Sequence, residues 1–245
     1  AEHVIVDECQ DIGPEILRML RGMVEEGPND LFLCGDSGQS LYKRHLSWLQ
    51  HNIDIRGRSR VLRVNYRTSR QIKDTADNLM PKKVSGPDDD KEDRESISIF
   101  DGPRPKIEIF PDEDSEINGI GSWLSLMIND GIKPHEILLI SRSPHSFERA
   151  RKAARIASTS VTKLTAEFNF HEGSVAFATT ERSKGLEYRA VCIFACDENL
   201  MPEQKRIDNA FDEQERGELL TIEKNQLYVA MTRARERLFI TGIHP

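Results

Sequence analysis

The sequence predicts an α/β protein with a mainly parallel β-sheet and helices on both faces of the sheet. Short apolar runs alternate along the chain with longer stretches of helical pattern, an order that is typical of β-α-β units. The apolar runs are continuous, as expected for strands that are buried on both faces. Hydrophobic residues make up 38% and charged residues 31% of the 245 residues, so the chain has the composition of a globular protein with one large domain or two smaller ones.

The individual elements follow from these runs in chain order. The apolar runs predict strands over residues 3–6, 31–35, 61–64, 106–110, 137–141, 175–179, 190–195 and 237–241, with a short extra strand over 97–100. The stretches between them predict helices over residues 14–26, 69–80, 114–129, 145–157 and 221–235. Gly13-Pro14 marks the start of the first helix, and Thr68 or Ser69 is placed to cap the second.

Charge is unevenly distributed along the chain. The formal net charge is −7, and because nucleic-acid-binding domains usually carry a basic excess, any contact with DNA must be local. The acidic stretch 87–95 predicts a solvated loop. A polar, basic stretch over 54–60 predicts the boundary between a domain over residues 1–58 and a domain over residues 59–245.

Nothing in the sequence predicts a membrane or secreted protein. No apolar run approaches the roughly 20 residues of a membrane span, and no secretory signal opens the sequence, so we expect a cytoplasmic protein without a membrane partner. Cys9, Cys34, Cys192 and Cys196 lie within or beside apolar runs, without the spacing of a zinc site. They are therefore interpreted as thiols packed in the core.

The stretch HVIVDECQD, residues 3–11, predicts a site for phosphate chemistry. Asp7 and Glu8 directly follow the apolar run Val4–Val6, and ligands of open α/β sheets bind beyond the carboxyl ends of the strands. One carboxylate there can hold Mg²⁺ while the other orients or deprotonates an attacking water. The alternative is that both acids cap the helix that begins near Gly13-Pro14. A second apolar run, Leu31–Cys34, also ends in a carboxylate, which places it beside the first strand in one sheet.

Five segments together resemble the ordered motifs of superfamily 1 DNA helicases of the UvrD/Rep/PcrA type. They are VDECQD at 6–11, GDSGQSLY at 35–42, VNYRTSRQI at 64–72, TTERSKGLEY at 179–188 and LYVAMTRARERL at 227–238. The resemblance is specific because the segments occur in the family's order and extend over almost the whole chain. It implies a RecA-like fold of the P-loop NTPase type, with residues 1–58 as the last part of a first RecA-like domain and residues 59–245 as the second.

The first two segments resemble motifs that handle the metal and the γ-phosphate. The resemblance implies that Asp7 binds Mg²⁺, that Glu8 activates water and that Gln10 couples nucleotide to DNA contacts. Gln39 would sense the γ-phosphate of ATP. A neutral amide suits this role because it can donate to a phosphate oxygen and loses the contact after hydrolysis.

The third and fourth segments resemble motifs that contact the rest of the nucleotide. The resemblance implies that Tyr66 stacks on adenine, Arg67 binds the γ-phosphate and Glu187 accepts from the ribose hydroxyls. A Tyr ring offers stacking area, and a guanidinium forks onto two phosphate oxygens. Gly185 permits a tight turn before Glu187. The alternative for an isolated pair is that Tyr66 packs in a core and Arg67 forms a surface salt bridge.

The fifth segment resembles the motif that supplies an arginine finger, which would be Arg233. Leu227, Ala230, Met231 and Ala234 follow the spacing of a buried helical stripe, which leaves Arg233 on the flank of that helix. An arginine in this role stabilises the charge that develops on the transferred phosphoryl group.

Contacts with single-stranded DNA are expected in the segments that follow the second motif. The family has an aromatic side chain after the position of Tyr42 that stacks on a base, but this chain has Lys43-Arg44-His45-Leu46-Ser47-Trp48 instead. Tyr42, His45 and Trp48 are the candidate DNA contacts here, and His45 or Trp48 is a candidate replacement for the stacking ring because base stacking tolerates different aromatic rings. A buried Trp48 is the alternative.

The fourth segment, residues 179–188, also differs from the family at a position that contacts DNA. The resemblance implies DNA contacts at Thr179 and Arg182. Where the family has a histidine or a similar donor that faces the DNA backbone, this chain has Glu181. A carboxylate repels phosphate, so a conventional contact is not expected at this position.

The sequence contains no GxxxxGK[ST] phosphate loop. The resemblance therefore implies part of an ATP-dependent DNA helicase that uses ATP and Mg²⁺ and has single-stranded DNA and its own N-terminal ATPase region as partners. Without the loop, this chain alone is expected to be inactive. Two alternatives stay open: a non-catalytic helicase-like module that binds nucleic acid or protein, and a DNA-stimulated ATPase that does not unwind.

Overall fold

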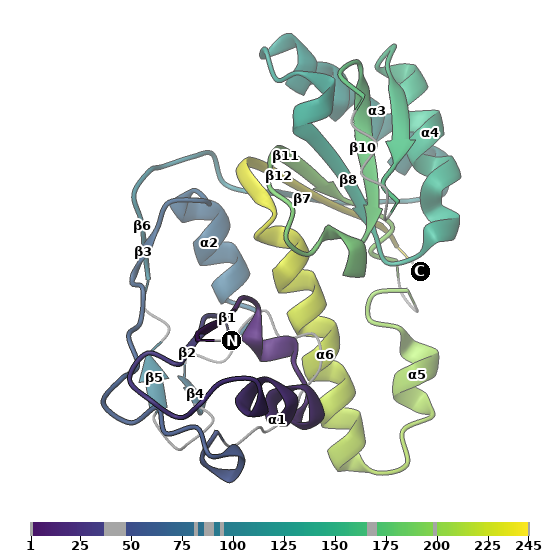
Figure 1. The fold of residues 1–245 in the computed structure, drawn as a ribbon. Coiled ribbons are helices and arrows are strands. Elements are labelled where there is room, and N and C mark those ends of the chain that lie inside the picture. The colour runs from purple at the N-terminus through teal and green to yellow at the C-terminus, as the bar shows by residue number, and fades with distance from the viewer. Residues whose placement is uncertain are drawn as a thin grey trace. The chain divides into compact units, whose positions relative to one another are not determined.

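The computed structural model describes residues 2–36, 48–80, 83–85, 91–93, 96–165, 171–197 and 200–244. Its internal contacts divide the chain into two compact units (Figure 1). The first unit is Ala1–Arg63 with Met80–Ser96, and the second unit is Val64–Leu79 with Ile97–Pro245. The segment Met80–Ser96 therefore belongs to the first unit, although it follows part of the second unit in the sequence. The sequence predicts a single boundary after residue 58.

The second unit is built on a six-stranded sheet in which every neighbouring pair is parallel. The strand order is β7-β12-β11-β8-β10-β9. The strands are β7 (Lys106–Phe110), β8 (Ile137–Ser141), β9 (Ser160–Lys163), β10 (Ser174–Thr179), β11 (Tyr188–Ile193) and β12 (Ala234–Ile243). The predicted α/β fold with a mainly parallel sheet is thereby confirmed.

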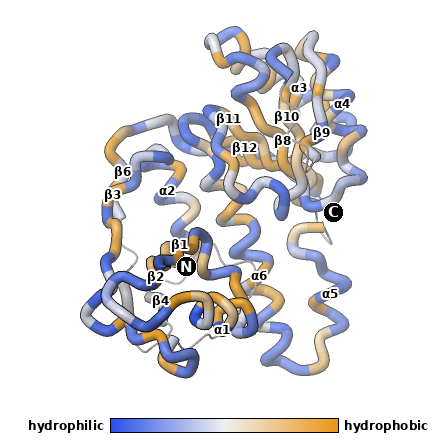
Figure 2. The backbone as a smooth tube through the Cα atoms, viewed as in Figure 1, coloured by the Kyte–Doolittle hydropathy of each residue, from blue (hydrophilic) through white to orange (hydrophobic). Residues whose placement is uncertain are grey.

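Helices cover both faces of this sheet, as predicted (Figure 1). The helices of the second unit are α2 (Arg70–Asp77), α3 (Glu113–Asn129), α4 (Phe147–Ile156), α5 (Gln204–Asp208) and α6 (Glu213–Met231). On β8, Ile137 and Leu139 pack in one core with α3 and α4, whereas Leu138 and Ile140 pack in another core with α2 and α6. Successive strand side chains point to opposite faces, so one continuous apolar run supplies both cores (Figure 2).

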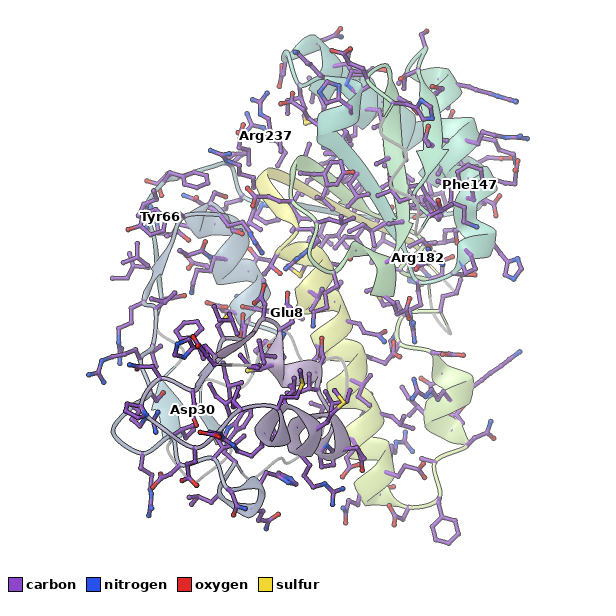
Figure 3. All side chains as sticks on the ribbon, viewed as in Figure 1. Glu8, Asp30, Tyr66, Phe147, Arg182 and Arg237 are labelled. Carbon is purple, nitrogen blue, oxygen red and sulfur yellow. The ribbon has the colours of Figure 1, made fainter. Side chains whose placement is uncertain are left out.

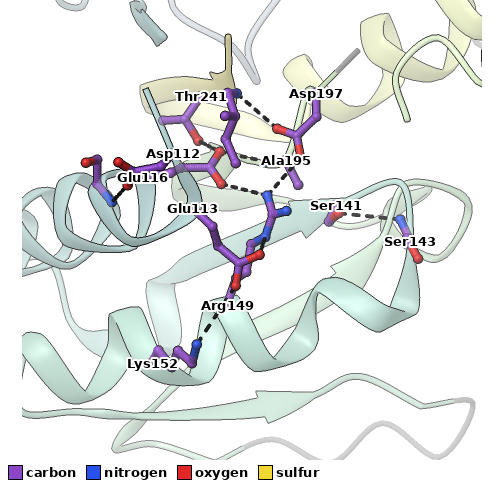
Figure 4. Close-up of polar contacts among 12 residues, drawn as sticks. Asp112, Glu113, Glu116, Ser141, Ser143, Arg149, Lys152, Ala195, Asp197 and Thr241 are labelled. Atoms are coloured by element: carbon purple, nitrogen blue, oxygen red, sulfur yellow. Dashed lines mark hydrogen bonds and ion pairs between the residues drawn. The ribbon is translucent and has the colours of Figure 1, made fainter. Parts of the chain in front are cut away.

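A buried carboxylate links the helices of one face to the centre of the sheet (Figure 4). Glu116 of α3 is fully buried, and its Oε1 accepts from the backbone N–H of Ala195 at 2.9 Å and the hydroxyl of Thr241 at 2.7 Å. Its Oε2 accepts from Arg149 of α4 at 3.0 Å. Arg149 also donates to Asp197 at 2.9 Å, so the charges in this network are paired.

The end of α6 differs from the prediction of a helix over 221–235. The helix begins earlier, after Asp212, whose side chain accepts from the N–H of Glu215 at 2.8 Å, and it ends before Thr232. Ala234 instead starts β12 and pairs with Tyr188 of β11. The prediction was wrong because the helical spacing continues for one more turn, whereas the pairing with β11 is invisible in the sequence.

Two further strand pairs lie outside the six-stranded sheet. The predicted strand 61–64 becomes β3 (Val64–Asn65), which pairs in parallel with β6 (Ile97–Ser98). Within the acidic stretch that was predicted to be a solvated loop, β5 (Lys91–Asp93) pairs with β4 (Lys83–Ser85). That prediction was therefore wrong for these three residues. The sequence also did not predict β9 or α5.

Besides β4 and β5, the described part of the first unit contains a short parallel strand pair and one α-helix. These elements are β1 (Val4–Val6), β2 (Leu31–Leu33) and α1 (Pro14–Gly22). Val4 pairs with Leu31, which confirms that the first two predicted strands lie side by side. Leu17, Trp48 and Ile53 form the core of this unit. Short 3-10 helices lie at Cys9–Asp11 and Leu49–His51 here, and at Pro134–Glu136, Pro144–Ser146 and Glu181–Ser183 in the second unit.

The four cysteines are free thiols. Cys192 is fully buried in the core shared with α3 and α4, and burial raises its pKa. Burial also raises the pKa of Cys196 to about 12. Among the helices in the described ranges, none is both long enough and apolar enough to cross a membrane.

We expect Glu116→Ala to lower the free energy of unfolding of the second unit by about 3 kcal/mol, because it leaves buried donors without an acceptor. Glu113→Ala is the matched control, since Glu113 also pairs with Arg149 but its side chain is 47% exposed, and it should cost less than about 1 kcal/mol. Urea unfolding followed by Trp123 fluorescence, with Trp48 changed to Phe, measures both losses. Equal losses for the two variants would contradict the role given to Glu116.

Candidate functional site

The two strands of the first unit each lead into a carboxylate. Asp7 follows β1, is exposed, and accepts through Oδ1 from the backbone N–H of Glu8 at 2.8 Å and from the thiol of Cys34 at 3.1 Å. Asp36 follows β2 and is also exposed. Because β1 and β2 are parallel neighbours, both acids lie at the same edge of the strand pair, as the sequence predicts.

Glu8 has a backbone conformation that is unusual for its residue type. Its φ of 54° and ψ of 39° lie in the left-handed region, which costs about 1 kcal/mol for a residue with a Cβ atom. The amide of Gln10 donates to the Glu8 carboxylate and accepts from the backbone N–H of Asp36 at 3.0 Å. Gln10 thus connects the segments that follow β1 and β2. A Cβ atom at Gly35 would lie 2.2 Å from the Gln10 Oε1 atom, so a larger residue there would displace the Gln10 side chain from this contact.

Asp7 and Glu8 do not cap the helix α1, which was the alternative interpretation of these two acids. The residue before α1 is Gly13, and Glu8 precedes the 3-10 helix Cys9–Asp11 without a capping bond from its side chain. Within the described ranges, no group of three or more His, Cys, Asp or Glu side chains is arranged to hold a metal ion. An exposed carboxylate such as Asp7 fits Mg²⁺, which usually keeps water and phosphate oxygens as its other ligands.

In the second unit, two residues with predicted nucleotide contacts lie together. The Nε atom of Arg67 donates to Oε2 of Glu187 at 3.1 Å, although the residues are 120 positions apart. The side chain of Asn65 holds the turn before α2 by accepting from the N–H of Arg67 at 2.8 Å and of Thr68 at 3.1 Å. Tyr66 is 70% exposed, which excludes its packing in the core of the described residues (Figure 3).

Arg233 is placed differently from its prediction. It lies beyond the end of α6 rather than on the flank of the helix, and it is fully buried. Its guanidinium donates to the carbonyl of Val229 at 2.9 Å, the carbonyl of Leu186 at 3.3 Å and the hydroxyl of Thr232 at 3.2 Å. Leu186 follows Gly185, whose φ of 77° allows the predicted turn. For a role on a phosphate, the guanidinium must leave these acceptors.

A pocket of about 600 Å³ lies at the carboxyl ends of three neighbouring strands, β8, β10 and β9. It is lined by Arg142, Pro144, Lys163, Leu164, Thr165, Thr179, Glu181 and Arg182. The structure therefore brings together Thr179 and Arg182, for which a DNA contact is predicted. Arg67 and Glu187 instead lie next to the amino ends of β11 and β12, so the predicted nucleotide and DNA residues of this unit occupy opposite edges of the sheet.

Carboxylates surround Arg142, one of the three cationic side chains that line the pocket. Its guanidinium pairs with Glu181, with Glu223 at 3.2 Å and with Glu203 at 3.5 Å, and its side chain is 12% exposed. Arg142 and Lys163 also line the pocket, although neither was predicted from the sequence as a site residue. Arg142 directly follows the apolar run of β8, which is a signal that was available, whereas Lys163 ends a strand that the sequence did not predict.

The predicted stacking residues are only partly within the described ranges. Trp48 is 7% exposed and packs against Leu17 and Ile53, which favours the packing role over a stacking role. Gln39, Tyr42 and His45 lie outside the described residues.

Comparison of the sequence with known proteins gives a family match and a similar curated protein. Residues 153–244 match the family described as the UvrD-like helicase C-terminal domain. The matched residues all lie within the second unit. A 67-residue stretch, 27% of the chain, is 45% identical to the ATP-dependent DNA helicase Rep of Buchnera aphidicola subsp. Acyrthosiphon pisum (strain APS). That match spans 9% of the length of the relative.

Two solved structures show a distant likeness. One is the C-terminal domain of a possible DNA helicase from Lactobacillus plantarum WCFS1, with 20% identity, a TM-score of 0.49, and coverage of 73% of this chain and 88% of the other. The other is the C-terminal part of the Fun30 ATPase domain, with 10% identity, a TM-score of 0.31, and coverage of 53% and 40%.

The contact between Asp7 and Cys34 can be tested by thiol chemistry. The hydrogen bond to Asp7 raises the pKa of Cys34. Asp7→Asn removes the negative charge, so the pKa of Cys34 should fall and its alkylation by iodoacetamide at pH 8 should accelerate about threefold or more. Peptide mapping by mass spectrometry measures the rate, and Glu15→Gln on α1 controls for the change in net charge. An unchanged or slower rate for Asp7→Asn would show that the contact is absent.

Proposed function

We propose that the chain is part of an ATP-dependent DNA helicase or translocase that couples ATP hydrolysis to movement on single-stranded DNA and to unwinding. The family match to a UvrD-like helicase C-terminal domain and the similarity to the Rep helicase support this class. In this proposal ATP and Mg²⁺ are the cofactors, and the partners are single-stranded DNA and an ATPase region that precedes this chain in the same protein.

The observation that carries the proposal is the pairing of Arg67 with Glu187. Two segments far apart in the sequence each supply one residue with a predicted nucleotide contact, and the two side chains lie 3.1 Å apart at their nearest donor and acceptor. Both side chains are about two-fifths exposed, so a nucleotide can reach them. A guanidinium and a carboxylate side by side offer a phosphate ligand and a ribose ligand to the same molecule. The exposed Tyr66, on the same turn as Arg67, adds a ring for the base.

In this proposal, the first unit supplies the residues that bind Mg²⁺ and activate water for ATP hydrolysis. Bound Mg²⁺ would neutralise phosphate charge, and the exposed carboxylate of Asp7 is the proposed ligand from this chain. The carboxylate of Glu8, oriented by Gln10, is the proposed acceptor for a proton of the attacking water. Because the sequence contains no phosphate loop, we propose that this chain does not hydrolyse ATP without the rest of the protein.

We propose that the pocket beyond β8, β9 and β10 contacts the backbone of single-stranded DNA. Lys163 and the exposed Arg182 provide positive charge, and Thr179 provides a hydroxyl donor. Glu181 limits this contact because it occupies Arg142 and adds a negative charge to the pocket. The pocket therefore favours a weak, salt-dependent contact.

A second candidate function is a helicase-like module that binds nucleic acid without catalysis. Two observations favour it: Glu181 pairs with Arg142 in the pocket, and Arg233 is buried on carbonyl groups instead of facing solvent. The retention of Asp7, Glu8 and Arg67 weighs against it, since binding alone needs no hydrolytic residues. A DNA-stimulated ATPase that does not unwind has the same residues as a helicase.

Turnover of ATP is the decisive measurement for the proposed function. The chain is extended by the upstream region of its protein, and ATP hydrolysis is measured with and without single-stranded DNA. We expect DNA to stimulate turnover and Arg67→Ala to lower it at least about 100-fold. Arg70→Ala is the control, because Arg70 lies on the same helix start but pairs with Asp101 at 2.7 Å. ATP turnover that DNA does not stimulate, or equal activity of the two variants, would contradict the proposed helicase or translocase function.

Arg233→Ala tests the arginine finger in the same assay. We expect a loss of at least about 100-fold in turnover, with thermal unfolding measured in parallel because the side chain is buried. Arg233→Lys separates the two roles, since lysine keeps the charge but cannot reproduce the forked hydrogen bonds. A folded Arg233→Ala variant with normal turnover would assign Arg233 to structure alone.

Binding of a fluorescent oligothymidine to the chain tests the pocket. We expect Glu181→Gln to raise affinity severalfold, because it removes a negative charge from the pocket and one of the three carboxylates that pair with Arg142. Arg182→Gln should reduce the slope of log affinity against log salt by about 0.7. Glu203→Gln is the matched control for Glu181, since Glu203 also pairs with Arg142 but does not line the pocket. Equal effects of Glu181→Gln and Glu203→Gln would place the DNA elsewhere.

A further inference from the structure

A short basic segment in the first unit is not used by any of the sites described above. Residues 56–63 read RGRSRVLR, and all four ionisable side chains in this stretch are arginines although the chain has a net charge of −7. We call these residues the basic segment. It lies between the 3-10 helix Leu49–His51 and β3, outside the described helices and strands, and every one of its residues is exposed.

We infer that the basic segment is a second contact for single-stranded DNA, separate from the pocket of the second unit. This inference rests on the proposed function and names a further surface for its nucleic-acid partner. The segment begins with a turn in which Gly57 has a φ of 70° and the N–H of Arg58 donates to the carbonyl of Ile55 at 3.0 Å. The arginines that follow this turn belong to an exposed stretch of chain.

The carboxylates of the first unit neutralise the arginines unequally. Arg56 is matched by Asp54, with its Nε atom 2.9 Å from Oδ1 and an Nη atom 2.7 Å from Oδ2, and this contact lowers the pKa of Asp54 to about 2. Arg58 lies 4.0 Å from Asp30, whose other oxygen accepts from Arg21 at 2.6 Å. Arg56 thus has its own carboxylate, whereas Arg58 shares one at long range.

The remaining two arginines have no carboxylate partner among the described residues. Arg60 donates to the carbonyl of Ser59 at 2.9 Å, which leaves its charge uncompensated. Arg63 is exposed, and no ion pair joins it to any residue in the described ranges. Arg58, Arg60 and Arg63 therefore present three guanidinium groups with donors that face water, and a row of anions is the complementary partner.

The apolar residues between these arginines favour a nucleic-acid strand over an acidic peptide. Leu62 is 91% exposed and Val61 is 44% exposed, and both lie between Arg60 and Arg63 in the sequence. A single strand alternates phosphates with accessible base faces, so it matches both the guanidinium and the apolar groups. An acidic peptide offers hydrated carboxylates without such faces, and a duplex keeps its base faces stacked.

The test compares the salt dependence of binding in two variants of the whole chain. Anisotropy of a fluorescent oligothymidine is measured between about 50 and 200 mM NaCl. We expect Arg58→Gln/Arg60→Gln/Arg63→Gln to reduce the slope of log affinity against log salt by about 2, because three contacts each release about 0.7 of a counterion from a single strand. At 50 mM salt, affinity should fall at least about tenfold. Leu62→Ser should weaken binding without changing the slope.

Two control variants exclude effects of net charge and of local structure. Arg18→Gln/Arg151→Gln/Arg155→Gln removes the same charge from exposed helical positions and should leave the slope within about 0.5 of the original value. Asp54→Asn/Arg56→Gln removes the neutralised pair within the same turn and should also leave it unchanged. Thermal unfolding of each variant verifies its fold.

Several outcomes would overturn the inference. The inference is wrong if the chain does not bind the oligonucleotide or if the triple arginine variant has an unchanged salt slope. It is also wrong if the charge-matched control loses as much slope as that variant. Stronger binding to a duplex or to polyglutamate than to the single strand would contradict it as well. If the slope is unchanged but Arg182→Gln still lowers it, the inference fails and the proposed function stands. If the slope falls but DNA does not stimulate ATP turnover, the basic segment binds DNA and the proposed helicase or translocase function is wrong.

Discussion

The hydrogen bonds of the buried Glu116 carboxylate are the constraint on which the second unit depends. This side chain joins α3 and α4 to Ala195 and Thr241, which lie near the carboxyl ends of the neighbouring strands β11 and β12. A buried charge is tolerated because each oxygen has a partner and Arg149 supplies the opposite charge. The network therefore aligns the helices of one face with the strands whose ends carry the functional residues.

With the sheet held in this way, its two edges have different chemistry. The amino ends of β11 and β12 bring together Arg67 and Glu187, which are exposed and paired with each other, and Arg233, which is buried on carbonyl groups. The carboxyl ends of β8, β9 and β10 form a pocket where Arg142 is enclosed by carboxylates. Parallel strands make this separation possible because all their amino ends lie at one edge and all their carboxyl ends at the other.

Local electrostatics reconcile the acidic net charge of the chain with the proposed contact to DNA. Most arginines of the described residues have carboxylate partners, as Arg142 and Arg149 illustrate, and such pairs offer little attraction to phosphate. Positive charge stays available where no ion pair to a carboxylate forms within the described residues, at Arg182 in the pocket and at Arg60 and Arg63 of the basic segment. Contacts of this kind provide salt-dependent binding without a basic surface over the whole protein.

The sequence by itself determined the α/β class, the strands β7 and β8 to the residue, the pairing of β1 with β2, and the resemblance to UvrD-like helicases, because apolar periodicity and motif order are local properties of the chain. It also identified Tyr66 and Arg67 as candidates before α2. Only the tertiary structure decided that α6 ends before Thr232, that Arg233 is buried, and that Glu181 holds Arg142. These features depend on strand order and register, which bring together side chains that are distant in the sequence, and no local pattern encodes such contacts.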